Sequence, residues 1–192
     1  MVVTKVKQIK SVNKLSDGLK YIEDGAKTIG TELIDSNLNF PVKMIGGQPV
    51  SQLVSGNLVI DVESAYSEFM MLKQLANLEK GRPINNEELL KNDVLAHHVI
   101  QSFSPEDNLT PEQVHEIGRK TALELTGGSH QFIIATHMDK GHLHNHIYIN
   151  STNSVTLNKF RWQKGTALSL FNISNKYADL YGAKILERKN QF

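Results

Sequence analysis

The chain has 192 residues, of which 40% are hydrophobic, so it is long and apolar enough to bury one core and fold as a single domain. It contains no cysteine, which excludes a disulfide framework and a thiolate metal site and leaves histidine, carboxylate or water as metal ligands. The 21 Lys and Arg residues against 20 Asp and Glu give a net charge of +1, without the basic excess typical of a nucleic-acid-binding protein.

The sequence shows no recognisable targeting segment. The N-terminal residues lack the apolar core of a signal peptide, and no apolar run is long enough to span a bilayer, so we expect a cytoplasmic protein without membrane insertion. Because the overall charge is nearly balanced, DNA binding would require a locally basic surface. Two segments are candidates for it, Lys5-Val6-Lys7-Gln8-Ile9-Lys10 and the stretch from Lys159 to Lys164.

The first half of the chain begins with a predicted strand and a predicted helix. Alternating β-branched residues predict a strand over Val2–Ile9, and helical spacing of apolar residues predicts a helix from about Val12 to Asp24 that carries Tyr21. Gly25 to Val54 is rich in turn residues and indicates an irregular excursion with room for one short hairpin. A strand over Leu53–Ile60 and an amphipathic helix over Ser64–Leu78 follow.

The second half alternates strands and helices. Thr110 as N-cap, Pro111 in the first turn and Gln113 at the third position predict a helix that runs to Thr126 and stops at Gly127-Gly128. The other predicted elements are strands over Asp93–Phe103, Gln131–Met138, His142–Ser151 and Ala183–Glu187, and a helix over about Gly165–Tyr181. Since a tight turn joins two of the strands, we predict an α+β fold with a central antiparallel sheet and helices packed largely on one face.

Four of the eight histidines lie within ten residues, at positions 137, 142, 144 and 146. If Lys140 and Gly141 form a two-residue turn, His137 pairs with His144, and Asp139 pairs with His142. His146 then shares a face of the sheet with His144, about 7 Å along the strand, so the three imidazoles of His137, His144 and His146 converge. Such a set suits a divalent metal with open positions for a substrate, and Asp139 is placed to orient a ligating ring from the outer sphere.

A structural zinc site is the alternative for these histidines. It would normally close with four ligands, often including cysteine, whereas three histidines with an open position are typical of a catalytic site. Three imidazoles would accept zinc or nickel in a purified sample, while manganese or magnesium serves in the cell.

At this hairpin the sequence resembles the relaxases of the HUH endonuclease superfamily, named for two histidines that flank one hydrophobic residue. The offsets from His137 to His144 and His146, seven and nine residues, are similar to the family's three-histidine metal motif. The resemblance extends over nearly the whole chain and is strongest to the P-type mobilisation relaxases, which are related to the agrobacterial enzyme that nicks T-DNA borders. The other matching segments are Gly18-Leu19-Lys20-Tyr21-Ile22, Leu53-Val54-Ser55-Gly56, Ala65-Tyr66-Ser67-Glu68-Phe69 and His98-Val99-Ile100-Gln101-Ser102-Phe103.

The resemblance implies a palm-like, ferredoxin-like fold and a role for individual residues. Tyr21 is the implied nucleophile, with the tyrosines at 66, 148, 177 and 181 as competitors, and His98 lines the active site, although a buried core histidine also explains it. Asn145 stands where the superfamily expects a hydrophobic residue, and His142-Leu143-His144 satisfies that pattern better. We favour His144 and His146 because their offset from His137 fits, which leaves His142 as an auxiliary residue or DNA contact.

The resemblance also implies the reaction and the partners. We expect a DNA relaxase that nicks and rejoins one strand of hairpin-containing, single-stranded DNA at an origin of transfer through a 5′-phosphotyrosyl intermediate. A relaxosome accessory protein, a coupling protein and a type IV secretion channel are implied, with transfer into the recipient cell alongside the DNA. Residues 1–192 would be one nicking-joining domain, the N-terminal part of a longer protein.

Basic and aromatic side chains after the last histidine strand are candidates for DNA contact. Lys159, Arg161 and Lys164 flank Trp162, a mixture suited to phosphate binding and base stacking, although a solvated loop explains it as well. Three alternative functions remain: a rolling-circle replication initiator or a transposase of the same superfamily, and a non-catalytic DNA-binding module.

Overall fold

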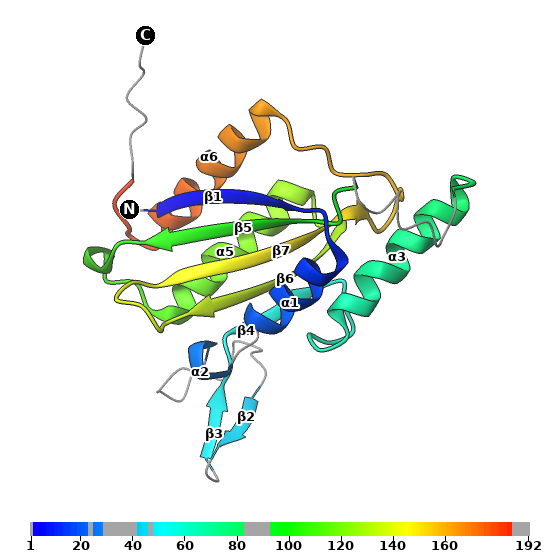
Figure 1. Ribbon diagram of the computed structural model, residues 1–192. Coiled ribbons are helices and arrows are strands. Elements are labelled where there is room, and N and C mark those ends of the chain that lie inside the picture. Colours follow the sequence, from blue (N-terminus) through cyan, green and yellow to red (C-terminus); the bar gives the residue numbers. More distant parts are fainter. Residues whose placement is uncertain (1, 23–24, 29–41, 46–47, 83–92, 186–192) are drawn as a thin grey trace.

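A five-stranded antiparallel sheet with the strand order β1-β5-β7-β6-β4 forms the centre of the protein (Figure 1). The structure is a computed structural model that describes residues 2–22, 25–28, 42–45, 48–82 and 93–185. The strands of this sheet are β1 (Val2–Ile9), β4 (Val54–Asn57), β5 (Ala96–Phe103), β6 (His130–His137) and β7 (His144–Asn153). β2 (Val42–Ile45) and β3 (Gln48–Ser51) form a separate hairpin, which agrees with the short hairpin expected in this region.

Helices cover the two faces of the sheet unequally. The longest two, α5 (Pro111–Thr126) and α6 (Lys164–Leu180), pack on one face over Ile134, Ile147 and Ile149. α1 (Val12–Ile22) and α3 (Ala65–Glu79) pack on the opposite face against Ile133 and Tyr148. In Figure 1, α1 lies in front of one end of the sheet and α5 passes behind it, while the one-turn α2 (Gly25–Thr28) follows α1.

The central antiparallel sheet and the α+β class are therefore confirmed. The expectation of helices largely on one face describes α5 and α6, while α1 and α3 add a partial second layer that leaves β1 uncovered on that side, where Lys5 and Lys7 are exposed. None of the helices in the described ranges combines the length and apolar character needed to cross a membrane.

The ends of α5 follow from its sequence as predicted. The Thr110 hydroxyl accepts the Gln113 backbone N–H, the Gln113 side chain accepts the Thr110 N–H, and Gly127 ends the helix with φ 64°. The predicted end of α1 at Asp24 lies outside the described residues, which show the helix to Ile22.

The connection between β6 and β7 differs from the prediction. His137 does pair with His144, but the strands end there and residues 138–143 form a wider loop, so Asp139 and His142 are not a strand pair. The reason lies outside the hairpin: the Met138 N–H donates to the Lys27 carbonyl, and the Leu143 carbonyl accepts the Phe103 N–H. These bonds occupy the backbone groups that would have extended the ladder.

The predicted strand over Ala183–Glu187 was wrong for the residues that the structure describes. Ala183 and Lys184 do not pair with a strand, because the Ala183 N–H donates to the Ala178 carbonyl at the end of α6, and the Lys184 N–H donates to the Asp107 carboxylate. Residues 186 and 187 lie outside the described ranges.

We expect the fold to lose stability in acid because several histidines are buried in their neutral form. His115 is fully buried between the hydroxyls of Ser55 and Thr136, at 2.7 and 2.9 Å, and burial lowers its pKa to about 3. The unfolded chain protonates this residue near pH 6.5. Its contribution to stability is therefore complete above that pH and declines as the pH falls toward 3, by about 2 kcal/mol at pH 5.

Urea unfolding of the metal-free protein at pH 7.5, 6 and 5 tests this expectation. His115→Gln should be less stable than the wild type at pH 7.5 but should lose less stability on acidification. Equal pH slopes for the two proteins would show that His115 does not titrate as its burial requires.

Candidate active site

Three imidazoles converge on the face of the sheet that carries α1. His137 on β6 pairs with His144 on β7, and His146 follows two residues later on the same face. The ring centroids of the three lie 4.5 to 5.2 Å apart, and one ligand nitrogen from each comes within 4.8 Å of the others. This is the set favoured from the sequence, and it has the neutral nitrogen donors that a divalent transition metal accepts.

The second nitrogen of each ring has a defined neighbour. His137 Nε2 lies 3.1 Å from the Ile22 carbonyl, and His144 Nδ1 lies 3.3 Å from the His142 carbonyl. His146 Nδ1 lies 2.9 Å from the Nε2 of His98. Outer contacts of this kind fix the tautomer and orientation of a metal-ligating imidazole. Burial lowers the pKa of His144, and that of His146 to about 2, so both rings are neutral at physiological pH, as ligands must be.

His98 belongs to the site as a neighbour of His146. Its ring stacks between those of His146 and Tyr148, with centroid distances of 5.1 and 4.2 Å. Burial lowers its pKa to about 4, so the ring is neutral at physiological pH and its Nε2 shares a hydrogen bond with His146 Nδ1 whose direction depends on the tautomer of each ring. The sequence left His98 open between site lining and core packing; in the structure its side chain is buried and contacts His146.

Asp139 and His142 lie in the loop between β6 and β7. Asp139 is exposed, and its negative charge opposes the effect of burial on the pKa of His144, but the partner of His144 Nδ1 is the backbone carbonyl of His142. The His142 ring is half-buried, 5.3 Å from that of His144, and is not one of the three convergent rings.

A buried polar network lies beneath the histidines, on the other face of the same two strands. Thr136 donates to the Asn145 side-chain oxygen at 2.7 Å, and the Asn145 amide donates to Gln101 at 3.0 Å and to the Val114 carbonyl at 2.7 Å. The network gives a reason for asparagine at position 145, where the superfamily pattern expects a hydrophobic residue, because its amide is the partner of the buried Gln101 side-chain oxygen.

Tyr21 stands beside the three histidines in the last turn of α1. Its ring centroid lies 5.7 Å from that of His137 and 6.2 Å from that of His146. The side chain is 47% exposed, and the Lys27 ammonium lies 3.7 Å from its ring centroid. Tyr148 shares this face but is buried, and the tyrosines at 66, 177 and 181 belong to α3 and the α6 end. Tyr21 is thus the tyrosine that is both exposed and next to the triad.

Gly18 allows α1 to approach the sheet this closely. A Cβ atom at position 18 would lie 2.3 Å from the Tyr148 hydroxyl, and Tyr148 is held by stacking on His98. The sequence analysis missed the roles of Gly18 and Lys27. A glycine in the middle of an amphipathic helix is the one signal that pointed to a close approach.

The basic and aromatic candidates for DNA contact do not lie next to His137, His144 and His146. Lys159, Arg161 and Trp162 lie in the segment after β7, and Lys164 begins α6. The structure places Lys159, Arg161 and Trp162 instead around one pocket with Gln8 of the N-terminal basic segment, whereas Lys164 is not among the residues that line it. Trp162 is half-buried against the core under α6, and Lys159 forms an ion pair with Asp93.

An HUH endonuclease is expected to be an α+β domain with three convergent histidines on its central sheet and an exposed tyrosine beside them. The described structure has these features. Residues 47–183 match the family model described as "Relaxase: MobA/VirD2-like, nuclease domain". The chain belongs to this family of relaxase nuclease domains.

Relatives with curated names agree with this assignment. The chain is 42% identical to the "Group II intron-interrupted relaxase LtrB" of Lactococcus lactis subsp. cremoris, over 98% of this chain and 38% of that protein. It is 38% identical to a "Protein rlx" of Staphylococcus aureus, over 54% of this chain and 29% of that protein. The chain thus spans well under half the length of these relatives.

A solved structure described as "Molecular Basis of Vancomycin Resistance Transfer in Staphylococcus aureus" has the same fold. It superposes with a TM-score of 0.51 at 15% sequence identity and covers 100% of both chains.

Metal titration should show whether His144 binds the metal together with His146 or together with His142. We expect His146→Ala to weaken Mn²⁺ binding by more than the roughly 10- to 100-fold typical of losing an outer-sphere partner, and His98→Ala to fall within that range. His142→Ala, the matched control in the loop, should bind like the wild type. Calorimetric titration of the metal-free proteins measures all three. Loss of binding in His142→Ala with normal binding in His146→Ala would assign the site to the other pair.

Proposed function

We propose that this domain nicks and rejoins one strand of DNA at the origin of transfer of a plasmid or conjugative element, through a covalent link to Tyr21. The observation that carries the proposal is the position of the Tyr21 ring, exposed and 5.7 Å from His137 and 6.2 Å from His146. Membership of the relaxase nuclease family supports DNA as the substrate, and favours a relaxase over the replication initiator, transposase and binding-module alternatives.

The reaction exchanges one phosphodiester for another. The Tyr21 hydroxyl oxygen attacks the phosphorus, the bond from phosphorus to the 3′ oxygen breaks, and the phenol gives up a proton while the departing oxygen takes one up. The products are a 5′-phosphotyrosyl strand and a free 3′-hydroxyl. Because no water is consumed and the number of phosphodiester bonds is unchanged, the 3′-hydroxyl can attack in return and restore the strand.

The protein's residues have separate tasks in this scheme. His137, His144 and His146 would hold the divalent ion, which when bound supplies positive charge to offset that on the non-bridging phosphate oxygens. His98 orients the His146 ring, and Lys27, over the Tyr21 ring, adds positive charge where the scissile phosphate must lie. The all-imidazole donor set fits manganese in the cell, and zinc or nickel in a purified sample, better than it fits magnesium.

The wider setting follows from the same proposal. The DNA would be single-stranded next to a hairpin, an accessory protein would help to expose it, and a coupling protein would deliver the covalent complex from the donor cytoplasm to a type IV secretion channel and the recipient cell. Residues 1–192 would form one nicking-joining domain, since the described elements other than the β2–β3 hairpin belong to one sheet and the helices packed on it.

A covalent adduct is the direct test of the nucleophile. The protein is incubated with labelled single-stranded DNA pools that contain origin-like hairpins, with manganese or with EDTA, and adducts are separated on denaturing gels. We expect a manganese-dependent adduct that disappears in Tyr21→Phe, with Tyr66→Phe as the matched control that retains it. An adduct that persists in Tyr21→Phe would move the nucleophile to another residue, and no adduct with any pool would support the binding-module alternative.

Gly18→Ala should slow nicking by displacing the nucleophile. The new methyl group would meet the Tyr148 hydroxyl and push α1, and with it Tyr21, away from the sheet. Since a misplacement of about 1 Å can cost roughly 100-fold in rate, we expect adduct formation at saturating Mn²⁺ to fall at least tenfold. Gly165→Ala in α6, where a Cβ would meet nothing within 4 Å, is the matched control. Equal rates for both variants would show that the approach of α1 does not position the nucleophile.

A further inference from the structure

A second site lies away from the three histidines, at the end of β1 and the beginning of β5. We propose that this pocket, of about 490 Å³, binds a nucleotide of single-stranded DNA that lies outside the nick site. The inference rests on the proposed function for the identity of the DNA, but the pocket is tested by binding alone. Its volume is in the range of pockets that hold small molecules.

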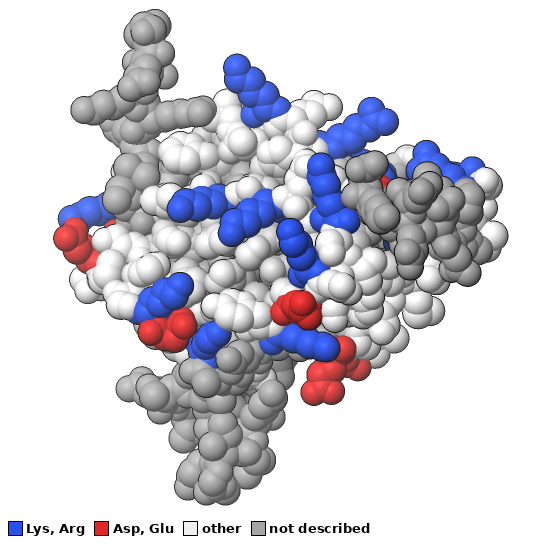
Figure 2. Space-filling view, viewed as in Figure 1, with Lys and Arg blue, Asp and Glu red and all other residues white. Residues whose placement is uncertain are grey.

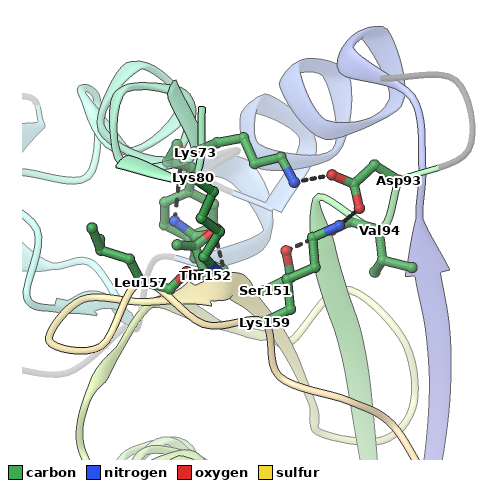
Figure 3. A network of polar contacts seen from close by, with 10 residues as sticks. Lys73, Lys80, Asp93, Val94, Ser151, Thr152, Leu157 and Lys159 are labelled. Atoms are coloured by element: carbon green, nitrogen blue, oxygen red, sulfur yellow. Dashed lines mark hydrogen bonds and ion pairs between the residues drawn. The ribbon is translucent and has the colours of Figure 1, made fainter. Parts of the chain in front are cut away.

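Positive charge dominates the lining of the pocket. It is lined by four basic side chains and a single carboxylate, together with polar and aromatic residues; the charged members are Lys80, Arg82, Lys159, Arg161 and Asp93. The carboxylate is already engaged, because one oxygen of Asp93 pairs with the buried Lys73 and the other pairs with Lys159 (Figure 3).

Within the described part of the chain, nothing neutralises the remaining cations. The Lys80 ammonium donates to the Leu157 carbonyl at 2.7 Å and to the Asn158 side chain at 3.3 Å, both uncharged (Figure 3 shows the first of these partners). The guanidinium groups of Arg82 and Arg161 form no ion pair or side-chain hydrogen bond with the described residues. Burial and the nearby cations lower the pKa of Lys159 to about 8. A bound phosphate would relieve this repulsion.

Three aromatic rings line the pocket beside these cations. The rings of His97, Phe160 and Trp162 contact one another with centroid distances of 5.5 Å for each pair with His97 and 6.1 Å for the third. Trp162 is half-buried, so part of its indole is accessible at the pocket. Cations that bind the backbone beside an aromatic ring that stacks a base are the combination by which proteins hold single strands, whereas the bases of a duplex are stacked on each other and cannot reach such a ring.

Two exposed lysines connect the pocket with the histidines. In the sheet register His146 lies opposite Ile100 and Ile100 opposite Lys5, and the next row on that face contains Tyr148, His98 and Lys7. Lys5 is thus two strands, or roughly 10 Å, from His146. Gln8, the next residue of β1, points to the other face of the sheet and lines the pocket together with its strand neighbour His97. Figure 2 shows Lys and Arg side chains gathered over β1 on the histidine face, with few acidic ones between them. Because β1 is an edge strand of the sheet, a DNA strand that leaves the nick site over these lysines would pass around this edge to reach the pocket.

Intrinsic fluorescence offers a probe specific to the pocket, because Trp162 is the sole tryptophan of the chain. We expect an oligothymidylate, added in EDTA so that no strand is cut, to quench Trp162 with saturation, and a duplex of the same length to quench it little. No quenching by the single strand, or equal quenching by the duplex, would overturn the proposal.

Charge reversal tests the contribution of the cations. Arg161→Glu and Arg82→Glu should each weaken binding of the oligothymidylate at least fivefold and lower the dependence of log K on log salt by about 0.7, the value for one phosphate contact on a single strand. Arg161→Lys should retain most of the affinity. Lys184→Glu, the matched control at the other end of the sheet, should bind like the wild type. Equal effects of Arg161→Glu and Lys184→Glu would assign the loss to overall charge and reject the pocket.

A comparison of short and long substrates separates this proposal from the proposed function. Extension of an oligonucleotide beyond the nick site should raise the rate of adduct formation by the wild type and leave the rate of Arg161→Glu unchanged by the extension. An adduct with no difference between the proteins on extended strands would keep the relaxase function and reject the pocket. Fluorescence quenching without any adduct would keep the pocket and reject the function.

Discussion

The pairing of His137 with His144 is the constraint on which the rest of the structure depends. Side chains alternate across a strand, so a slip of one residue in this pairing would turn every side chain of β7 to the other face. In the observed register, His144 and His146 face α1 while Asn145 faces α5. The slipped register would bury two imidazoles under α5 and place an amide beside Tyr21. The register of β6 and β7 therefore creates both the three-histidine centre and the packing surface on the other face of the sheet.

The polar network under the sheet favours the observed register of β7. From Ser55 to Gln101 the side chains of His115, Thr136 and Asn145 form a continuous chain of hydrogen bonds of 2.7 to 3.0 Å. Gln101 continues it to Thr121 on α5 and Ser174 on α6. In a register of β7 shifted by one residue, Asn145 would leave the network and the Gln101 side-chain oxygen would lose this partner, and a buried polar group without a partner costs about 1–3 kcal/mol. An apolar core would tolerate a slip more readily, because hydrophobic contacts are not directional. The network thus adds specificity to the stability that burial supplies.

Much of this site could be predicted because it depends on contacts that are local in sequence. Two strands joined by a short connection have a calculable register, so the convergence of His137, His144 and His146 followed from their spacing, and the ends of α5 followed from its caps. The features that the sequence patterns did not reveal depend on distant contacts. The loop after β6 is wide because Lys27 and Phe103 bond to its ends, and Lys159 is held by Asp93, which no periodicity reveals. The approach of α1 to Tyr148 likewise depends on a ring 130 positions away from Gly18.

The net charge of +1 gave little sign of the proposed DNA binding, and the structure offers a reason. Two acidic side chains of the helical layer are matched locally: Glu116 pairs with Arg119 within α5, and Glu124 of α5 pairs with Lys176 of α6. These pairs cancel in the total without reducing the positive potential over β1, where Lys5 and Lys7 are exposed on the histidine face. Solvent-exposed charges act over a Debye length of about 8 Å at physiological salt, so the balance that matters to a DNA strand is that of the face it crosses. Local pairing of acidic side chains on α5 and α6, away from the exposed lysines of β1, is how a nearly neutral domain can present a basic surface beside the three histidines.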